Sequence, residues 1–128
     1  VTGYFLDHLP EDLVPYWDLE FGDGSGEPRD SSSTSIAACG MLEMAQYMEE
    51  EEAALYRSIA RKIMKSVVDN YAVKDKALSN GLVLHSTYSK KSPYNTCTPE
   101  GVDECNIWGD YFYMEALTRL SKAWNPYW

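Results

Sequence analysis

Positively charged residues are scarce in this sequence: 11 Lys and Arg stand against 20 Asp and Glu, for a formal net charge of -9. An acidic surface repels a phosphate backbone and is not attracted to an anionic membrane. The sequence also lacks an apolar run near the roughly 20 residues that span a bilayer. We therefore expect a protein that binds no nucleic acid and enters no membrane.

Cysteine is scarce as well. Cys39, Cys97 and Cys105 make an odd count at low density, unlike a disulfide scaffold. Free thiols in a reducing, cytoplasmic compartment are the simpler interpretation, with a Cys97 to Cys105 bridge or a metal site including His85 as alternatives. Because the spacing matches no zinc pattern, we expect no metal ion, and we expect no cofactor.

What the sequence does contain is enough apolar material for one packed domain: 45% of its 128 residues are hydrophobic and 13% aromatic. The chain begins at Val1 rather than Met, and its first apolar residues repeat at helical spacing until Pro10. This opening indicates a start inside a helix, and hence a piece of a longer parent protein.

Three helices are predicted. Asp30 to Met48 opens with Asp and Ser as capping residues and is apolar on almost every side, which is typical of a buried helix. Ile107 to Trp124 is also expected to be mostly buried. Glu51 to Tyr71 carries one apolar stripe opposite a charged face, so it should lie on the outside.

The remaining segments break helical periodicity. Residues 10–30 are rich in Pro, Gly and Asp and should form a long structured loop. Residues 73–106 are expected to hold a short strand at Gly81 to Tyr88 followed by a polar loop. This alternation of buried and outer helices suits a ring of inner helices wrapped by outer ones, although a bundle or solenoid has the same periodicity. The absence of a fixed internal repeat disfavours the solenoid.

Four stretches carry a family resemblance: PYWD at Pro15 to Asp18, PRDSSSTSIAACGMLEMA at Pro28 to Ala45, GLVLHSTYSKK at Gly81 to Lys91, and GVDECNIWGDYFYMEALTRL at Gly101 to Leu120. Together, and in this order, they resemble the C-terminal third of the bacterial unsaturated glucuronyl hydrolases, glycoside hydrolase family 88. A related family that acts on unsaturated rhamnogalacturonides is the alternative.

The resemblance implies an all-α fold, a partial (α/α)6 toroid of the six-hairpin glycosidase type. Residues 1–128 would be the C-terminal part of a single glycoside hydrolase domain, with the active site where loops join outer to inner helices. The implied reaction is hydration of a vinyl ether, which releases 4,5-unsaturated glucuronic acid from lyase-generated glycosaminoglycan oligosaccharides. This route differs from the two-carboxylate displacement of ordinary glycosidases.

By the same resemblance, the catalytic aspartates belong to the upstream portions of the family. Asp18, Asp30, Asp103 and Asp110 each suit a turn or a helix start, so none is assigned as a catalytic acid. We therefore expect the chain alone to be inactive and to contribute binding rather than chemistry.

The resemblance also points to binding residues. In family members that prefer sulfated substrates, a Ser-x-x-Ser-x-Lys pattern holds the sulfate, and Ser86, Ser89 and Lys91 fit that spacing. Two hydroxyl donors and a cation suit a sulfate group, whereas a plain polar surface loop is the competing interpretation.

Three more residues are candidates for sugar contacts. Tyr88 and Trp108 offer apolar plates for a sugar ring, with a core position as the alternative for Trp108. Arg29 is a candidate for a uronate carboxylate near a helix start, unless it pairs with Asp30 or Glu27. The expected ligand is thus an unsaturated glycosaminoglycan oligosaccharide, sulfated or unsulfated.

Two further expectations concern the chain as a free molecule. A helix surface that loses its neighbours in a ring favours association, so we expect the chain to self-associate. The rival in another class is an independent helical interaction domain whose aromatic surface binds a protein partner.

Overall fold

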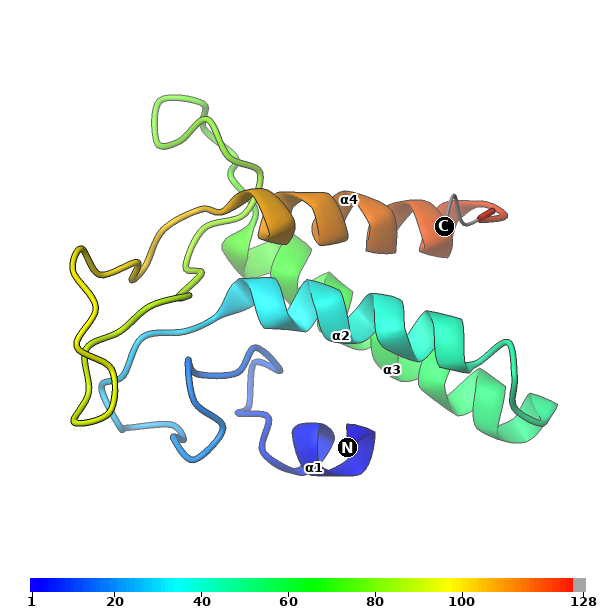
Figure 1. Ribbon diagram of the computed structural model, residues 1–128. Coiled ribbons are helices and arrows are strands. Elements are labelled where there is room, and N and C mark those ends of the chain that lie inside the picture. Colours follow the sequence, from blue (N-terminus) through cyan, green and yellow to red (C-terminus); the bar gives the residue numbers. More distant parts are fainter. Residues whose placement is uncertain (126–128) are drawn as a thin grey trace.

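The computed structural model describes residues 1–125. Its elements are α1 (Thr2–Asp7), α2 (Ser31–Met44), α3 (Glu50–Ser66), the π-helical turn η1 (Val67–Tyr71) and α4 (Ile107–Ser121) (Figure 1). Within those 125 residues the β pairing is confined to isolated bridges. The all-α prediction is therefore confirmed.

The short strand predicted at Gly81 to Tyr88 is wrong. The segment makes single bridges, such as the one between Ser86 and Glu104, and no ladder. His85, in its middle, has a φ of 65°, in the left-handed region. That conformation interrupts an extended run, so alternation along this segment does not produce a strand.

Helix α2 begins where the sequence predicts. The Asp30 carboxylate accepts a hydrogen bond from the backbone N–H of Ser32 at 3.2 Å, which caps the free donors of the first turn. The helix ends at Met44 rather than at the predicted Met48. Residues 45–49 instead form the turn that reverses the chain into α3.

Helix α3 has the predicted single apolar stripe. Its buried side chains are Ala53, Ala60, Ile63 and Met64, and its first turn carries three glutamates. The helix then widens into η1, where the N–H of Ala72 bonds to the carbonyl of Val67 at 2.9 Å. The predicted outer helix is thus confirmed, in two pieces.

Helix α4 starts at an Asn106 cap, whose side-chain oxygen accepts the Gly109 N–H at 2.6 Å. The prediction that the whole helix is mostly buried is wrong. Ile107, Tyr111 and Met114 are 82%, 44% and 51% exposed, because α2 and α3, the helices that pack against α4, leave these side chains uncovered. The helix also ends at Ser121, before the predicted end at Trp124.

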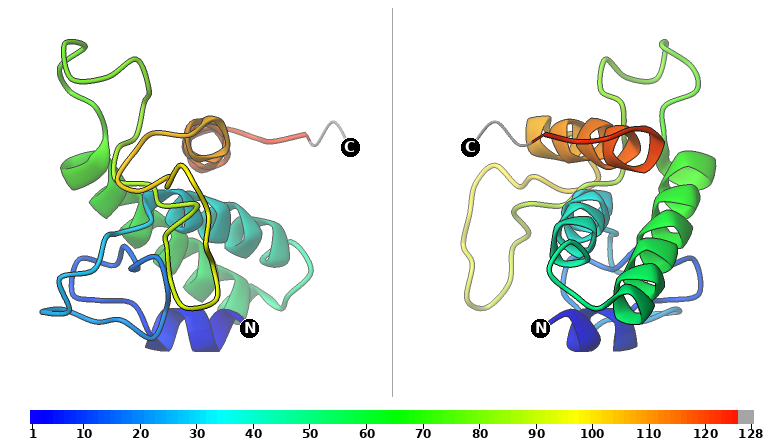
Figure 2. Two further views of the ribbon diagram at one scale, coloured as in Figure 1. Left: turned by 60° about the vertical axis from the view of Figure 1, so that its left-hand side comes forward. Right: turned by 90° about the vertical axis from the view of Figure 1, so that its right-hand side faces the viewer.

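The helices form two layers. Helices α2 and α4 run parallel and side by side, and α3 runs in the opposite direction (Figure 1). Seen end-on, α2 lies between α4 and α1 with α3 beside it (Figure 2). The core fills the space between α2, α3 and α4 with side chains at most 1% exposed: Ala38, Ala60, Ile63, Met64, Val67 and Ala116. This is the arrangement of inner and outer helices that the toroid implies.

Nearly all irregular chain gathers at one end of these helices. The loops of residues 8–30 and 72–106 lie at the end where α2 and α4 begin (Figure 1). The opposite end carries the short turn between α2 and α3. Among the described residues, no helix is both long and apolar enough to cross a bilayer.

Candidate functional site

The N-termini of α2 and α4 meet closely at the loop end. A Cβ on Gly109 would lie 2.8 Å from Oδ1 of Asn106 and 3.2 Å from Cβ of Ser32. Glycine therefore permits this approach of the two helix starts. The Asp110 carboxylate, one residue further on, accepts the N–H groups of Leu82 and Val83 at 2.9 and 3.1 Å. The loop that carries the predicted binding residues is thus tied to α4.

Ser86 lies inside this junction. It is fully buried, and its Oγ is 3.1 Å from Oγ of Ser31, which itself donates to the carbonyl of Leu84 at 2.6 Å. Its backbone pairs with Glu104 in both directions. The hydroxyl therefore packs between the loop and α2 and is shielded from solvent. Its predicted contact with a sulfate stays a prediction without a surface to support it.

Ser89 and Lys91 lie on an accessible segment. The backbone of Ser89 pairs with Gly101, and the Lys91 N–H donates to the carboxylate of Glu100 at 2.6 Å. Ser89 is half-buried and Lys91 is exposed. Within residues 1–125, neither the Ser89 hydroxyl nor the Lys91 ammonium has a hydrogen-bonding or ion-pair partner. Both groups are available to an anionic ligand.

Tyr88 and Trp108 form an aromatic pair beside this segment. Their ring centroids are 5.4 Å apart at 81°, and both side chains are exposed, Trp108 by 40%. The Tyr88 hydroxyl donates to Glu104 at 3.0 Å, and this hydrogen bond raises the pKa of Tyr88. A Cβ on Gly101 would lie 2.1 Å from the Tyr88 ring, so glycine there seats the ring. The structure places Trp108 at the surface and not in the core.

Arg29 is engaged by the first loop, and its predicted contact with a uronate carboxylate stays a prediction. Its guanidinium donates to the carbonyl of Val14 at 2.6 Å, forms ion pairs with Asp12 and Asp23 at 3.2 Å each, and lies 3.9 Å over the Tyr16 ring. Its carboxylate partners are thus neither Asp30 nor Glu27. The first loop folds around Arg29, and a uronate would have to displace these groups to reach it.

The aspartates hold the loops as the sequence predicts. Asp30 caps α2, Asp110 anchors the second loop, and Asp18 accepts the Glu20 N–H at 3.0 Å. Asp103 pairs with Nδ1 of His85 at 2.5 Å, where both residues have a positive φ. Each carboxylate therefore stabilises a turn or a helix start.

A second polar cluster, which the sequence pattern does not reveal, lies next to Ser89. The Glu27 carboxylate accepts the indole N–H of Trp17 at 2.8 Å and lies 3.4 Å from the Lys90 ammonium. These residues lie in two loops that are far apart in sequence. The adjacent lysines at 90 and 91 were a signal, but nothing local distinguished the paired lysine from the free one.

The cysteines are free thiols in the structure. Cys39 is buried between α2 and α4, and burial raises the pKa of its thiol to about 12. Among residues 1–125, no cluster of three or more His, Cys, Asp or Glu side chains is arranged to hold a metal ion.

We compared the chain with family models and with known proteins. No family model matches the chain. The chain is 46% identical over 130 residues to the unsaturated chondroitin disaccharide hydrolase of Streptococcus pyogenes and 35% identical over 130 residues to the unsaturated glucuronyl hydrolase of Bacillus sp. strain GL1. Both alignments cover 100% of this chain but only 31% and 33% of the relatives. The chain thus spans about a third of the curated relatives.

Solved structures extend the similarity to the fold. A variant of the unsaturated glucuronyl hydrolase of Streptococcus agalactiae superposes with a TM-score of 0.88 at 44% identity, over 99% of this chain and 35% of that one. The Bacillus enzyme gives 0.82 at 34% identity, over 94% and 31%. The predicted resemblance to these hydrolases and the partial toroid are therefore confirmed.

Proposed function

We propose that residues 1–128 are the C-terminal part of a single-domain hydrolase that releases 4,5-unsaturated glucuronic acid from lyase-generated glycosaminoglycan oligosaccharides. The observation that carries the proposal is identity of 35% to 46%, along the whole chain, to hydrolases of unsaturated uronate sugars. The loop end supports it, because the exposed Tyr88–Trp108 pair adjoins in sequence a segment whose Ser89 hydroxyl and Lys91 ammonium have no partner among the described residues. A cytoplasmic location stays a prediction.

The direct test is loss of absorbance of the conjugated double bond when the full-length parent is given unsaturated disaccharides. Turnover of a glycosaminoglycan disaccharide is expected, with little or none on the unsaturated rhamnogalacturonide. The reverse preference would favour the rhamnogalacturonyl alternative. Activity on neither, by a folded parent, would contradict the proposal.

We propose that the substrate is sulfated, and that Ser89 and Lys91 bind the sulfate group. A variant of the Streptococcus agalactiae relative has been solved in complex with dGlcA-GalNAc6S. In this chain the Ser89 hydroxyl and the Lys91 ammonium lie on one accessible segment next to Tyr88. A hydroxyl donor and a cation beside an aromatic plate suit a sulfated sugar.

The purified 128-residue chain is expected to show no turnover at concentrations where the parent is active. Its aspartates at the loop end are engaged in capping and turn contacts, so none is poised to protonate a substrate. The measurement is the same absorbance assay, with the parent as the positive control. Measurable turnover by the chain alone would place a catalytic group within it.

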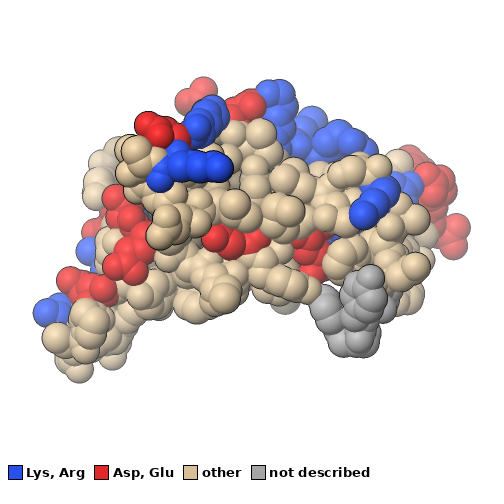
Figure 3. Space-filling model, turned by 90° about the horizontal axis from the view of Figure 1, so that it is seen from above, with Lys and Arg blue, Asp and Glu red and all other residues tan. Residues whose placement is uncertain are grey.

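We further propose that the free chain associates with a second copy through apolar side chains exposed on α2 and α4. Ile36 is 40% exposed and stands between two hollows, one against α1 and one against α4. On α4, Ile107, Tyr111 and Met114 are exposed, and uncharged atoms cover most of the middle of that face (Figure 3). This chain spans only 35% and 31% of the solved relatives, so about two thirds of their length has no counterpart in it, and a second copy is the occupant available to the free chain in solution.

Light scattering over a dilution series tests this association. We expect a dimer or larger species that dissociates on dilution, because burial of apolar surface contributes roughly 25 cal/mol per Å². Ile36→Glu should shift the chain towards monomer, whereas Leu55→Glu on exposed α3 serves as the matched control. A strictly monomeric, cooperatively folded chain at high concentration would favour the independent interaction domain.

A further inference from the structure

One carboxylate connects the two loops of the candidate site. Oε2 of Glu27 accepts the indole N–H of Trp17 at 2.8 Å and lies 3.4 Å from Nζ of Lys90. The side chains of Lys90 and Glu27 are only 27% and 28% exposed, so the pair is partly shielded from water. The Phe21 ring lies 5.7 Å from the Trp17 ring and completes the support of the indole.

Lys90 lies between the two residues assigned to the sulfate. Ser89 precedes it and forms an isolated bridge with Gly101, and Lys91 follows it. Because Lys90 is bonded to both residues through the backbone, a fixed position of its side chain limits the conformations open to Ser89 and Lys91. A contact that holds Lys90 therefore restricts the directions of both neighbours.

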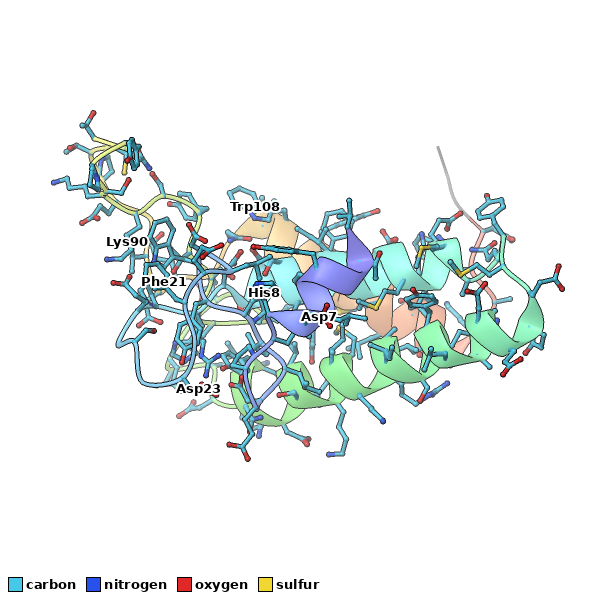
Figure 4. The ribbon with its side chains drawn as sticks, turned by 90° about the horizontal axis from the view of Figure 1, so that it is seen from below. Asp7, His8, Phe21, Asp23, Lys90 and Trp108 are labelled. Atoms are coloured by element: carbon cyan, nitrogen blue, oxygen red, sulfur yellow. The ribbon has the colours of Figure 1, made fainter. Side chains whose placement is uncertain are left out.

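We propose that the Glu27–Lys90 ion pair is a positioning contact that orients Ser89 and Lys91 towards the sulfate group of the substrate. The inference rests on the proposed function, because it assigns a device to that same site. Figure 4 shows Lys90 and Phe21 at the loop end, with Trp108 over the start of α4. The first loop thereby determines how the second loop presents its anion-binding groups.

The known contacts of residues 89 and 91 are made by their backbone groups, so their side chains are not held by them. Ser89 is held by its backbone pairing with Gly101, and Lys91 by the bond from its N–H to Glu100. Neither contact engages the hydroxyl of Ser89 or the ammonium of Lys91. The Glu27 contact also gives the Lys90 ammonium an acceptor of its own, so that Lys90 does not compete with Lys91 for the ligand.

The test is steady-state kinetics of the full-length parent with Lys90→Gln, Glu27→Gln and the double variant, on sulfated and unsulfated disaccharides. We expect KM for the sulfated substrate to rise about two- to fivefold, the range of a partly exposed ion pair, with kcat unchanged. KM for the unsulfated substrate should stay the same. KM of the double variant for the sulfated substrate should equal that of either single variant. Lys90→Arg keeps the positive charge and should keep the parental KM.

Glu50→Gln is the matched control, because it removes an exposed ion pair with Arg57 on α3 that lies outside the loops. The inference would be overturned by an equal rise in KM on both substrates, by additive effects of the two single variants, or by an unchanged KM in the Lys90 variants.

Lys91→Ala distinguishes a failure of the positioning contact from a failure of the sulfate site. If it alters the sulfate preference while the Lys90 variants do not, only the positioning role is wrong; if it has no effect, the sulfate site itself is wrong. A parent inactive on both disaccharides would overturn both proposals.

Discussion

Arg119→Met is expected to lower the free energy of unfolding by about 3 to 5 kcal/mol, the usual effect of breaking a buried ion pair from one side. The Arg119 side chain is only 7% exposed and forms ion pairs with Glu115 of its own helix at 2.8 Å and with Glu43 of α2 at 2.7 Å. Glu115 is 3% exposed, so loss of the guanidinium leaves a buried carboxylate without its cation. The measurement is urea denaturation at a fixed protein concentration.

Two variants make this stability test specific. Arg57→Met removes an arginine from an exposed pair with Glu50 and should change the free energy of unfolding by about 1 kcal/mol at most. The double variant Arg119→Met, Glu115→Leu replaces both buried charges by apolar groups and should recover most of the loss. If Arg119→Met were as stable as the parental chain, the ion pair between Arg119 and Glu115 would be solvated and not buried.

The pH dependence of the same variant has a defined direction. The hydrogen bond from Arg119 holds the pKa of Glu43 below its ordinary value. A depressed pKa contributes stability above the ordinary pKa, and this contribution disappears as the pH falls through the folded value. The parental chain should therefore lose this part of its stability in acid, whereas Arg119→Met should lack it at every pH.

Lys91→Ala and Ser89→Ala in the full-length parent are expected to lower kcat/KM for a sulfated disaccharide far more than for its unsulfated counterpart. Charge-assisted hydrogen bonds contribute about 1.5 to 3 kcal/mol each, or roughly 10- to 150-fold in kcat/KM. Lys91 is expected to show the larger effect, since it supplies the charge. The ratio of kcat/KM on the two substrates cancels general losses of activity.

Ser86→Ala is the informative comparison for this selectivity test. The sequence groups Ser86 with Ser89 and Lys91, but the structure buries its hydroxyl against Ser31. We expect a loss of about 1 kcal/mol in stability and an unchanged selectivity ratio. A change in the ratio with Ser86→Ala, and none with Lys91→Ala, would show that the loop opens to bind its ligand.

The helices and their starts were readable from the sequence because their causes are local. Asp30 followed by three serines predicted the cap of α2, and the single apolar stripe after Glu51 predicted an outer helix. The strand predicted at Gly81 to Tyr88 is wrong because His85 adopts a left-handed conformation, in which it pairs with Asp103, 18 residues further along the same loop. Periodicity does not report such contacts.

The site residues divide in the same way. Ser89 and Lys91 are predicted from the family resemblance, and Tyr88 and Trp108 from their aromatic rings. The structure leaves Lys91, Tyr88 and Trp108 exposed and Ser89 half-buried. The partners of Arg29 were missed, because Asp12 and Asp23 reach it only through the folding of the first loop. The Glu27 contact with Lys90 was missed for the same reason.

By itself, the sequence determined which segments are helical, which helix faces are apolar and which known hydrolases the chain resembles, since these depend on residue order. Only the tertiary structure decided which side chains are exposed to solvent and so accessible to a ligand. The close approach of α2 and α4 at Gly109 buries Ser86, whereas α2 and α3, the helices that pack against α4, leave Ile107 and Met114 exposed. Burial depends on what packs against a residue in space, and most of those partners are distant in sequence.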